Sequence, residues 1–329
     1  MPSVESYAIV FIVAVCLTLF STPIAASILR KRGYLDDPNE RSSHVIPTPR
    51  GAGIAQIVGV TGALAVAGGI PVSGMFAIAG YSILGAADDF KPRPPSVRLV
   101  LQVLIGLAAV LLAFNSQNAP SWNPFLLGVV GVLMLLGMVN ASNFMDGING
   151  ISLAHGIIFG FAYSVILWQA SVADWVPLGA ILAGISIAVL PWNWGKSAKI
   201  FLGDSGSYLM GASVALLILA TGLLGPGFLV ALAPVTIYLA DTCSTVLRRA
   251  WRNESLTIAH RDHVYQQLIR EGWSHPHSAI YVASCSVIAC LIALALQQSS
   301  IPIPVGVLLL IGLTVVYLSS PHVVKRCSN

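Results

Sequence analysis

Residues 201–224 read FLGDSGSYLMGASVALLILATGLL, a polar turn that leads directly into an apolar run. From Ser207 to Leu224 the chain carries no charged side chain over 18 residues. At a rise of about 1.5 Å per residue, a helix of this length crosses most of a bilayer's hydrocarbon core, which is about 30 Å thick. The stretch therefore predicts a transmembrane helix that begins just after Asp204.

The rest of the chain has the same character. Of its 329 residues, 56% are hydrophobic and only 9% are charged, whereas soluble domains are about 25% charged. A soluble fold is excluded, because so few charges cannot cover its surface. We expect an all-α, polytopic transmembrane helical bundle that forms one integral-membrane domain over residues 1–329. It has about eleven spans, near 7–29, 52–70, 72–87, 99–114, 124–140, 151–170, 175–191, 207–224, 228–246, 278–297 and 301–319.

The basic residues predict the orientation of this bundle. With eleven spans, all 17 Lys and Arg residues fall on one side of the membrane. The positive-inside rule assigns that side to the cytoplasm. We therefore expect a periplasmic N-terminus and a cytoplasmic C-terminus. The cytoplasmic loops are expected near residues 30–51, 88–98, 140–150, 192–207 and 247–277.

Polar side chains gather at the cytoplasmic ends of the spans. Since they share one side and one membrane level, a bundle can bring them together, which predicts an active site. The four segments are Asp88-Asp89, the stretch Asn140-x-x-Asn143-x-x-Asp146-Gly-x-Asn149-Gly150, the turn around Asp204, and His260-Arg261-Asp262-His263.

These residue types favour phosphate chemistry. Carboxylates and Asn carbonyls suit Mg²⁺, or Mn²⁺, better than zinc. The Gly-rich turns at 147–150 and 203–206 lead into helices, whose N-termini favour anions. The basic residues Arg98, Lys199 and Arg261 lie close to these segments in sequence. A divalent metal beside anion-binding elements predicts phosphate or diphosphate transfer, and the bilayer setting predicts a lipid substrate.

Several of these residues also have a purely structural interpretation. Asp204 could be a helix N-cap, and the Asp88-Asp89 pair an interfacial helix end. Asp241 lies inside a predicted span, where it either forms a hydrogen-bonded structural acid or reaches into the site. His44 could be a surface residue, and His155 is expected in the core.

In these segments the chain resembles the polyprenyl-phosphate N-acetylhexosamine-1-phosphate transferase superfamily (glycosyltransferase family 4). Its O-antigen-initiating branch is the most similar. The resemblance runs from Arg41-Ser-Ser-His44 and Pro47-Thr-Pro-Arg50-Gly51 to the His260–His263 loop. It implies a Mg²⁺-dependent enzyme of the bacterial cytoplasmic membrane, with its site facing the cytoplasm. The reaction moves a sugar 1-phosphate from a UDP-N-acetylhexosamine to undecaprenyl phosphate, releasing UMP and starting O-antigen or related polysaccharide synthesis.

The resemblance also implies roles for individual residues. Asp204 is the expected metal ligand, and Asp88 and Asp89 are the paired acids at the metal and lipid phosphate, as catalytic residues. Nucleotide-sugar contacts fall to Asn140, Asn143, Asp146 and Asn149, and diphosphate or sugar contacts to His260, Arg261 and His263. Further candidates are His44, Arg50, Arg98, Lys199 and Asp241.

One position departs from the family pattern. The family usually has Asp-Gly-x-Asp-Gly where this chain has Asp146-Gly-Ile-Asn149-Gly150. Asn keeps hydrogen-bonding capacity and removes a charge, so a role that needs a carboxylate at residue 149 is in doubt.

Rival functions stay open at this stage. One is the phospho-N-acetylmuramoyl-pentapeptide transferase of the same superfamily, whose run of adjacent histidines is missing here. A second, less favoured, is a secondary transporter, which would place ionisable groups near the bilayer midplane. The sugar and the choice between direct attack and a covalent Asp intermediate also stay open. A homodimer is expected only by analogy, and no nucleic-acid partner is expected.

Overall fold

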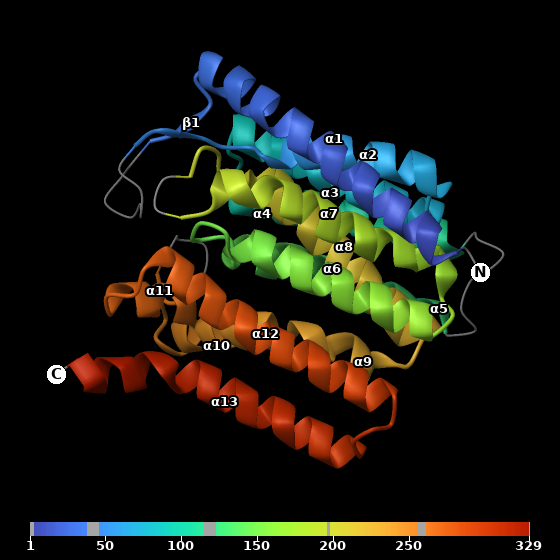
Figure 1. Cartoon of the computed structure of the whole chain (residues 1–329). Helices are drawn as coiled ribbons and strands as arrows, with labels where there is room; N and C mark the ends of the chain where they lie inside the picture. Colours follow the sequence, from blue (N-terminus) through green and yellow to red (C-terminus); the bar gives the residue numbers. More distant parts are fainter. Residues whose placement is uncertain (1–2, 38–45, 115–122, 196–197, 256–260, 329) are drawn as a thin grey trace.

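The computed structural model describes residues 3–37, 46–114, 123–195, 198–255 and 261–328, drawn in Figure 1 as a helical bundle. Within these ranges, two short strands and two 3-10 turns accompany the helices. The elements are α1 Val4–Lys31, β1 Leu35–Asp36, β2 Thr48–Pro49, α2 Gly53–Ala67, α3 Val72–Phe90, α4 Pro95–Phe114, α5 Pro124–Phe144, α6 Ile151–Gln169, η1 Ala173–Trp175, α7 Val176–Asn193, α8 Gly203–Leu224, α9 Phe228–Leu232, η2 Ala233–Val235, α10 Thr236–Trp251, α11 Val264–Arg270, α12 His275–Gln297 and α13 Ile303–Ser328.

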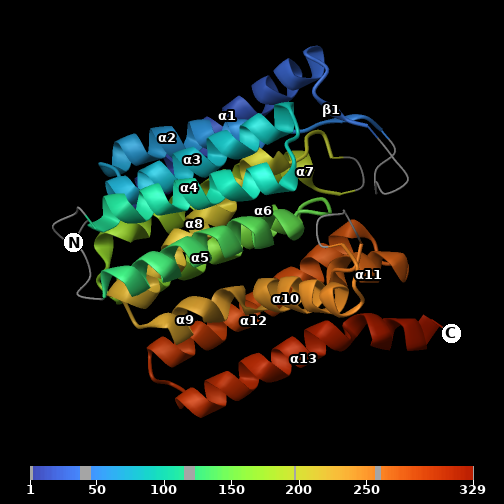
Figure 2. The same cartoon turned by 180° about the vertical axis from the view of Figure 1, so that it is seen from behind.

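Helix α8 forms the centre of the bundle, as the views in Figures 1 and 2 agree. In its most apolar window 83% of the residues are buried, compared with 17% in the outer helix α13. Small residues on α8 permit close helix packing: Gly211 lies against the backbone of Val139 on α5. The polar turn at the start of α8 is therefore surrounded by the ends of other helices.

The predicted helical bundle is confirmed. In the described parts of the chain, nine helical segments are long and apolar enough to cross a membrane. The remaining two predicted spans are also helical: α2 is a shorter apolar helix of 15 residues, and α3 has 19 residues. Between them, Gly68 adopts a left-handed conformation at the break expected near residues 69–71. The number of spans and the orientation of the termini remain predictions.

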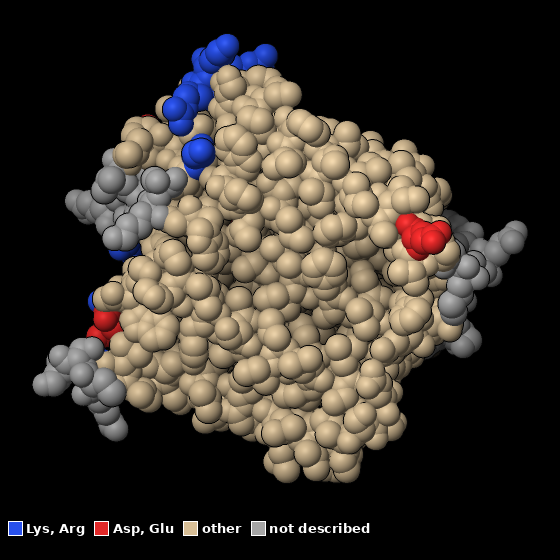
Figure 3. All heavy atoms as spheres, in the orientation of Figure 1, with Lys and Arg blue, Asp and Glu red and all other residues tan. Residues whose placement is uncertain are grey.

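In the space-filling view (Figure 3), Lys and Arg side chains gather at the end of the molecule where α1 ends and β1 begins, and an acidic patch lies at the opposite end. The broad middle of the face in view carries no charged side chain. An uncharged belt with charge at its edge is the surface that a bilayer-embedded protein requires.

The helices extend further into the predicted loops than the sequence indicated. Asp88 and Asp89 lie in the last turn of α3, Asn140 and Asn143 in the last turns of α5, and Asp204 in the first turn of α8. These polar groups find partners on neighbouring helix ends, so the helices need not stop before them. The hairpin of β1 and β2, which pairs Leu35 with Pro49, was not expected.

Candidate active site

Glycines allow the backbone at the start of α8 to pack directly against the backbones of α2 and α3. A Cβ atom on Gly85 of α3 would overlap the carbonyl group of Asp204, and one on Gly53 of α2 would overlap the backbone N of Gly206. Only glycine fits at such contacts. The close approach places the Asp88-Asp89 pair directly beside the first turn of α8.

A short backbone pairing brings Arg50 to the same place. Phe201 donates its N–H to the Pro49 carbonyl at 2.8 Å and accepts the N–H of Gly51 at 3.1 Å. Arg50 itself forms an isolated parallel bridge with Phe201. Since Phe201 lies three residues before Asp204, the Arg50 side chain reaches the acid cluster.

Asp204 is contacted from three other segments of the chain. Its Oδ1 accepts hydrogen bonds from Arg50 Nη2 at 2.6 Å and from Asn143 Nδ2 at 3.0 Å. Its Oδ2 lies 3.7 Å from Nη1 of Arg98, at the start of α4. The structure thus brings together Asp204, Asn143, Arg50 and Arg98, four of the residues that the sequence singled out.

Both carboxylate oxygens of Asp89 accept hydrogen bonds from the backbone of α8. Its Oδ1 accepts the N–H of Asp204 at 2.7 Å, and its Oδ2 accepts the N–H of Ser205 at 2.9 Å. It also accepts a hydrogen bond from Arg50 Nε at 3.1 Å. Asp89 therefore satisfies free N–H groups at the start of α8, as an N-capping side chain does.

Asp88 retains one oxygen without a hydrogen bond. Its Oδ1 accepts from Arg93 Nη1 at 3.0 Å. Its Oδ2 is buried, has no hydrogen-bond partner among the described residues, and lies 3.5 Å from Arg98 Nε. A buried, unbonded carboxylate oxygen beside a guanidinium has spare capacity to accept a cation or a proton.

The donor set suits the magnesium ion expected from the sequence. The described residues contain no group of three His, Cys, Asp or Glu side chains arranged to hold a metal. Mg²⁺ needs fewer protein ligands than that, because it is commonly held by one or two carboxylates together with substrate phosphates. Asp204 and Asp88, both within 4 Å of Arg98, are a donor pair of that kind.

The residues between α5 and α6 divide into two groups. Asn143 joins the acid cluster, whereas Asn140 donates to Gln102 Oε1 at 2.7 Å and to its own helix. Burial raises the pKa of Asp146 to about 7; Arg50 lowers it, and the nearby Asp204 and Asp89 raise it further. Asp146 therefore lies within the electrostatic field of the cluster.

The Asn149 side chain donates a hydrogen bond that an ionised carboxylate could not donate. Its Nδ2 donates to the Gly195 carbonyl at 2.7 Å, and its backbone N–H points to His275 Nδ1 at 3.4 Å. Asn193 fixes the next residue by accepting the N–H of Gly150 at 2.7 Å. The amide at residue 149 thus joins this loop to the one before α8.

The histidine loop is anchored by Asp241. This buried acid accepts from His263 Nδ1 at 3.1 Å, from the Val264 N–H at 3.1 Å and from Tyr317 Oη at 2.7 Å. Of the two interpretations of Asp241, the hydrogen-bonded structural acid fits these contacts. His263 is itself buried, so its contacts are structural, and its expected anion-binding role stays a prediction.

Arg261 is the member of this loop with unused donors. Its Nη2 is buried without a hydrogen-bond partner among the described residues. Lys199 lies over the Trp192 ring, 5.2 Å from the centroid. The predictions for His44 and His260 fall outside the described residues. His155 lies in the core, as expected, hydrogen-bonded to the Ile151 carbonyl and to Ser286.

Two site residues were not among the sequence candidates. Arg93 pairs with Asp88, and Gln102 binds Asn140. A signal existed for both: Arg93 follows the Asp88-Asp89 pair by four residues, and Gln102 is a polar residue inside an apolar run one turn after Arg98.

Comparison with known proteins finds a matching family model. The model of glycosyl transferase family 4 matches residues 72–222, from α3 to α8. The chain is 29% identical, over 82% of its length and 77% of the relative's, to decaprenyl-phosphate N-acetylglucosaminephosphotransferase of Mycobacterium tuberculosis.

Two further relatives are similar along most of their length. Undecaprenyl-phosphate alpha-N-acetylglucosaminyl 1-phosphate transferase of Escherichia coli K12 is 27% identical, covering 92% of this chain and 86% of the relative. A probable undecaprenyl-phosphate N-acetylglucosaminyl 1-phosphate transferase of Bacillus subtilis is 26% identical, covering 89% and 86%. With the helical bundle, these similarities indicate a multi-pass membrane protein that resembles glycosyl transferase family 4 over residues 72–222 and polyprenyl-phosphate sugar-phosphate transferases along most of its length.

Proposed function

We propose that this enzyme transfers an N-acetylhexosamine 1-phosphate from a UDP-sugar to undecaprenyl phosphate, at the cytoplasmic face of the bacterial inner membrane. The observation that carries the proposal is the set of contacts around Asp204, where Arg50, Arg98 and Asn143 meet one carboxylate. Three relatives with polyprenyl-phosphate N-acetylglucosamine-phosphate transferase names support it. The product would begin O-antigen or related surface-polysaccharide synthesis.

The reacting groups are anions, so the site must first offset their repulsion. Arg50, Arg93 and Arg98 supply positive charge beside the acids. Arg261, with its unbonded Nη2, is suited to a diphosphate oxygen. Magnesium held by Asp204 and Asp88 would supply charge neutralisation of the diphosphate.

A direct transfer fits these residues better than a covalent intermediate. In the direct route an oxygen of the lipid phosphate attacks the β-phosphorus of the donor. The bond from that phosphorus to the bridging oxygen breaks, and its electron pair leaves with UMP. A phosphate monoester has a second pKa of about 6 and is mostly ionised near neutral pH, so the attack needs orientation more than a strong base.

The two neighbouring acids have different places in this scheme. Asp88 retains an unbonded oxygen, which suits it to accept a proton from the acceptor or to hold the metal. Asp89 is committed to the backbone of α8. We therefore assign Asp88 to the reaction and Asp89 to positioning Asp204.

The test is UMP release by purified enzyme from a panel of UDP-N-acetylhexosamines, with and without undecaprenyl phosphate and Mg²⁺. The proposal expects release that needs the lipid and the metal, and UDP-N-acetylglucosamine is the first donor to try.

Asp204→Ala and Asp88→Asn should nearly abolish UMP release, whereas Glu5→Gln, at an exposed residue of α1, should not change it. Release without lipid, or full activity of both variants, would refute the proposal. Selective use of UDP-muramoyl-pentapeptide would favour the peptidoglycan branch.

A further inference from the structure

A second group of polar side chains lies inside the bundle, one or two helical turns from the acid cluster. Each of the helices α3, α4, α5 and α8 contributes one residue, at a spacing of three, four or seven from its own member of the cluster. These spacings keep two side chains on one face of a helix. The pairs are Tyr81 and Asp88 on α3, Gln102 and Arg98 on α4, Asn140 and Asn143 on α5, and Tyr208 and Asp204 on α8. We refer to Tyr81, Gln102, Asn140 and Tyr208 as the polar layer.

Gln102 is the centre of the polar layer. Its Oε1 accepts a hydrogen bond from Asn140 Nδ2 at 2.7 Å, and its backbone carbonyl accepts one from Tyr81 Oη, also at 2.7 Å. Tyr208 interacts with the Gln102 side chain and with the charges of the acid cluster. Gln102 is only 1% exposed. This one buried residue therefore joins α4 to α3, α5 and α8.

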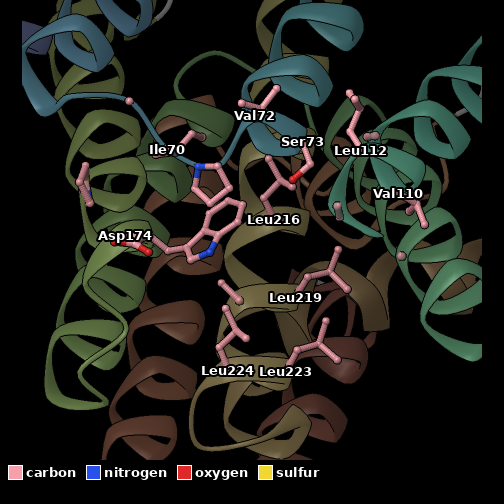
Figure 4. A pocket seen from close by; sticks show the side chains of 18 of the residues that line it. Ile70, Val72, Ser73, Val110, Leu112, Asp174, Leu216, Leu219, Leu223 and Leu224 are labelled. Atoms are coloured by element: carbon pink, nitrogen blue, oxygen red, sulfur yellow. The ribbon is translucent and has the colours of Figure 1, made fainter. Parts of the chain in front are cut away.

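Helix α4 has little other packing to fix its position. In its most apolar window 22% of the residues are buried, whereas the corresponding value for α8 is 83%. A cavity of about 590 Å³ lies between the second half of α4 and α8. Figure 4 shows Val110 and Leu112 of α4 across this cavity from Leu216 and Leu219 of α8. The hydrogen bonds at Gln102 therefore supply much of what holds α4 in place.

The position of α4 matters because Arg98 is held beside the acids without close bonds. Its Nε lies 3.5 Å from Asp88 Oδ2, and its Nη1 lies 3.7 Å from Asp204 Oδ2. Both distances exceed the about 2.7–2.9 Å of a charge-assisted hydrogen bond. The place of the guanidinium is therefore set by its helix, and Gln102 lies one turn further along the same face of that helix.

We propose that Gln102 is a positioning residue that acts through Arg98. By joining α4 to α3 and α5, it keeps the guanidinium where it faces both Asp88 and Asp204. The inference rests on the proposed function, in which positive charge at this place offsets the repulsion between the lipid phosphate and the donor diphosphate. The placement matters for the rate, since an error of about 1 Å can cost about a hundredfold.

Gln102→Met tests the proposal with little disturbance of the fold. Methionine is unbranched and of similar length, and it removes the side-chain carbonyl that accepts the bond. The donor left behind keeps a partner, because Asn140 Nδ2 also donates to the Leu136 carbonyl at 2.8 Å. We expect kcat for UMP release to fall by about tenfold or more, and KM for the UDP-sugar to stay within about twofold of the wild-type value.

Gln297→Met is the matched control. Gln297 ends α12 and donates from Nε2 to the Ile166 carbonyl at 2.9 Å, so the same substitution removes a comparable bond between helices. It should change neither kcat nor KM. An equal fall in kcat in both variants, or an unchanged kcat in Gln102→Met, would refute the positioning role.

A double variant tests whether the effect passes through Arg98. Arg98→Lys retains the positive charge and loses the planar guanidinium. If Gln102 acts by placing that guanidinium, adding Gln102→Met to Arg98→Lys should lower kcat by less than about twofold further. Losses that multiply would show that the two residues act independently, which contradicts the inference. A wild-type enzyme that releases no UMP contradicts the proposed function instead.

The hydrogen bond at the centre of the polar layer can be tested without turnover. Gln102→Met and Asn140→Leu each remove it, so each should lower the melting temperature in detergent by about 2 °C. Because both lose the same bond, the double variant should melt no lower than the less stable single variant. Lowerings that add, or none at all, would rule out the polar layer whether or not the enzyme is active.

Discussion

Asp89 accepts the backbone N–H of Asp204 at 2.7 Å, so the second acid of the pair on α3 fixes the first turn of α8. The same carboxylate accepts the N–H of Ser205 and a hydrogen bond from Arg50. Two neighbouring aspartates thus differ in what they can do: Asp88 has one oxygen without a hydrogen bond, whereas both oxygens of Asp89 accept hydrogen bonds.

Asp89→Ala is expected to lower both stability and turnover. Removing an N-capping side chain costs about 1 kcal/mol, and the Arg50 guanidinium loses one of its two acid partners. Asp204→Asn should abolish turnover and leave the cap intact. Thermal denaturation in detergent, run beside the UMP-release assay, checks this difference. If Asp89→Ala melts like the wild type and only its activity falls, Asp89 acts in the reaction and the positioning role is wrong.

Asn149→Asp tests the departure from the family pattern. An ionised carboxylate cannot donate the hydrogen bond that Asn149 gives to the Gly195 carbonyl, and it would repel that oxygen. We expect a loss of stability of about 1–3 kcal/mol near neutral pH. Because a protonated carboxyl can donate, part of the loss should be recovered as the pH falls. Measured stability that is unchanged by the substitution at every pH would show that the amide is not needed here.

The sequence predicted the helices well because each carries its own apolar signal. Length and hydropathy are local properties, so the span around residues 207–224 needed no knowledge of its neighbours. The shared side of Asp88, Asn143 and Asp204 was also predictable, since it follows from counting spans.

Pairings between distant segments were not predictable in the same way. The approach of Arg50 to Asp204 depends on backbone bonds between residues 49–51 and Phe201 and on the glycines at helix contacts. Likewise, Asp241 and His263 are 22 residues apart, and neither one alone indicates that the other will hold it in the core. The sequence pattern identified the polar segments, whereas tertiary packing determines which of their residues face the site.

Asp146 predicts a pH dependence of stability. Burial raises its pKa to about 7, above the ordinary value of about 4. Between these values the folded protein retains a proton that the unfolded chain has released, so this carboxyl's contribution to stability is lost as the pH rises through about 7.

Asp146→Asn, which stays neutral, should therefore match the wild type in stability near pH 4, at about the ordinary pKa of Asp. Above about pH 7, the raised pKa of Asp146, it should be more stable than the wild type. Thermal denaturation of both proteins across this range, without nucleotide sugar, provides the measurement. A stability difference that does not change with pH would contradict the raised pKa of the Asp146 carboxyl.

Gly85→Ala should separate the site's geometry from its chemistry, since it adds one methyl group and changes no charge. That methyl would overlap the Asp204 carbonyl, so α3 and α8 must move apart. Overpacking of this kind costs about 1–3 kcal/mol, and the shift would carry Asp88 and Asp89 away from Asp204. We expect reduced stability and a large loss of turnover.

Gly137→Ala on α5 is the matched control, because a methyl there meets no atom within 4 Å and alanine favours a helix by about 1 kcal/mol over glycine. Wild-type turnover in Gly85→Ala would mean that the acid pair does not need its close contact with α8.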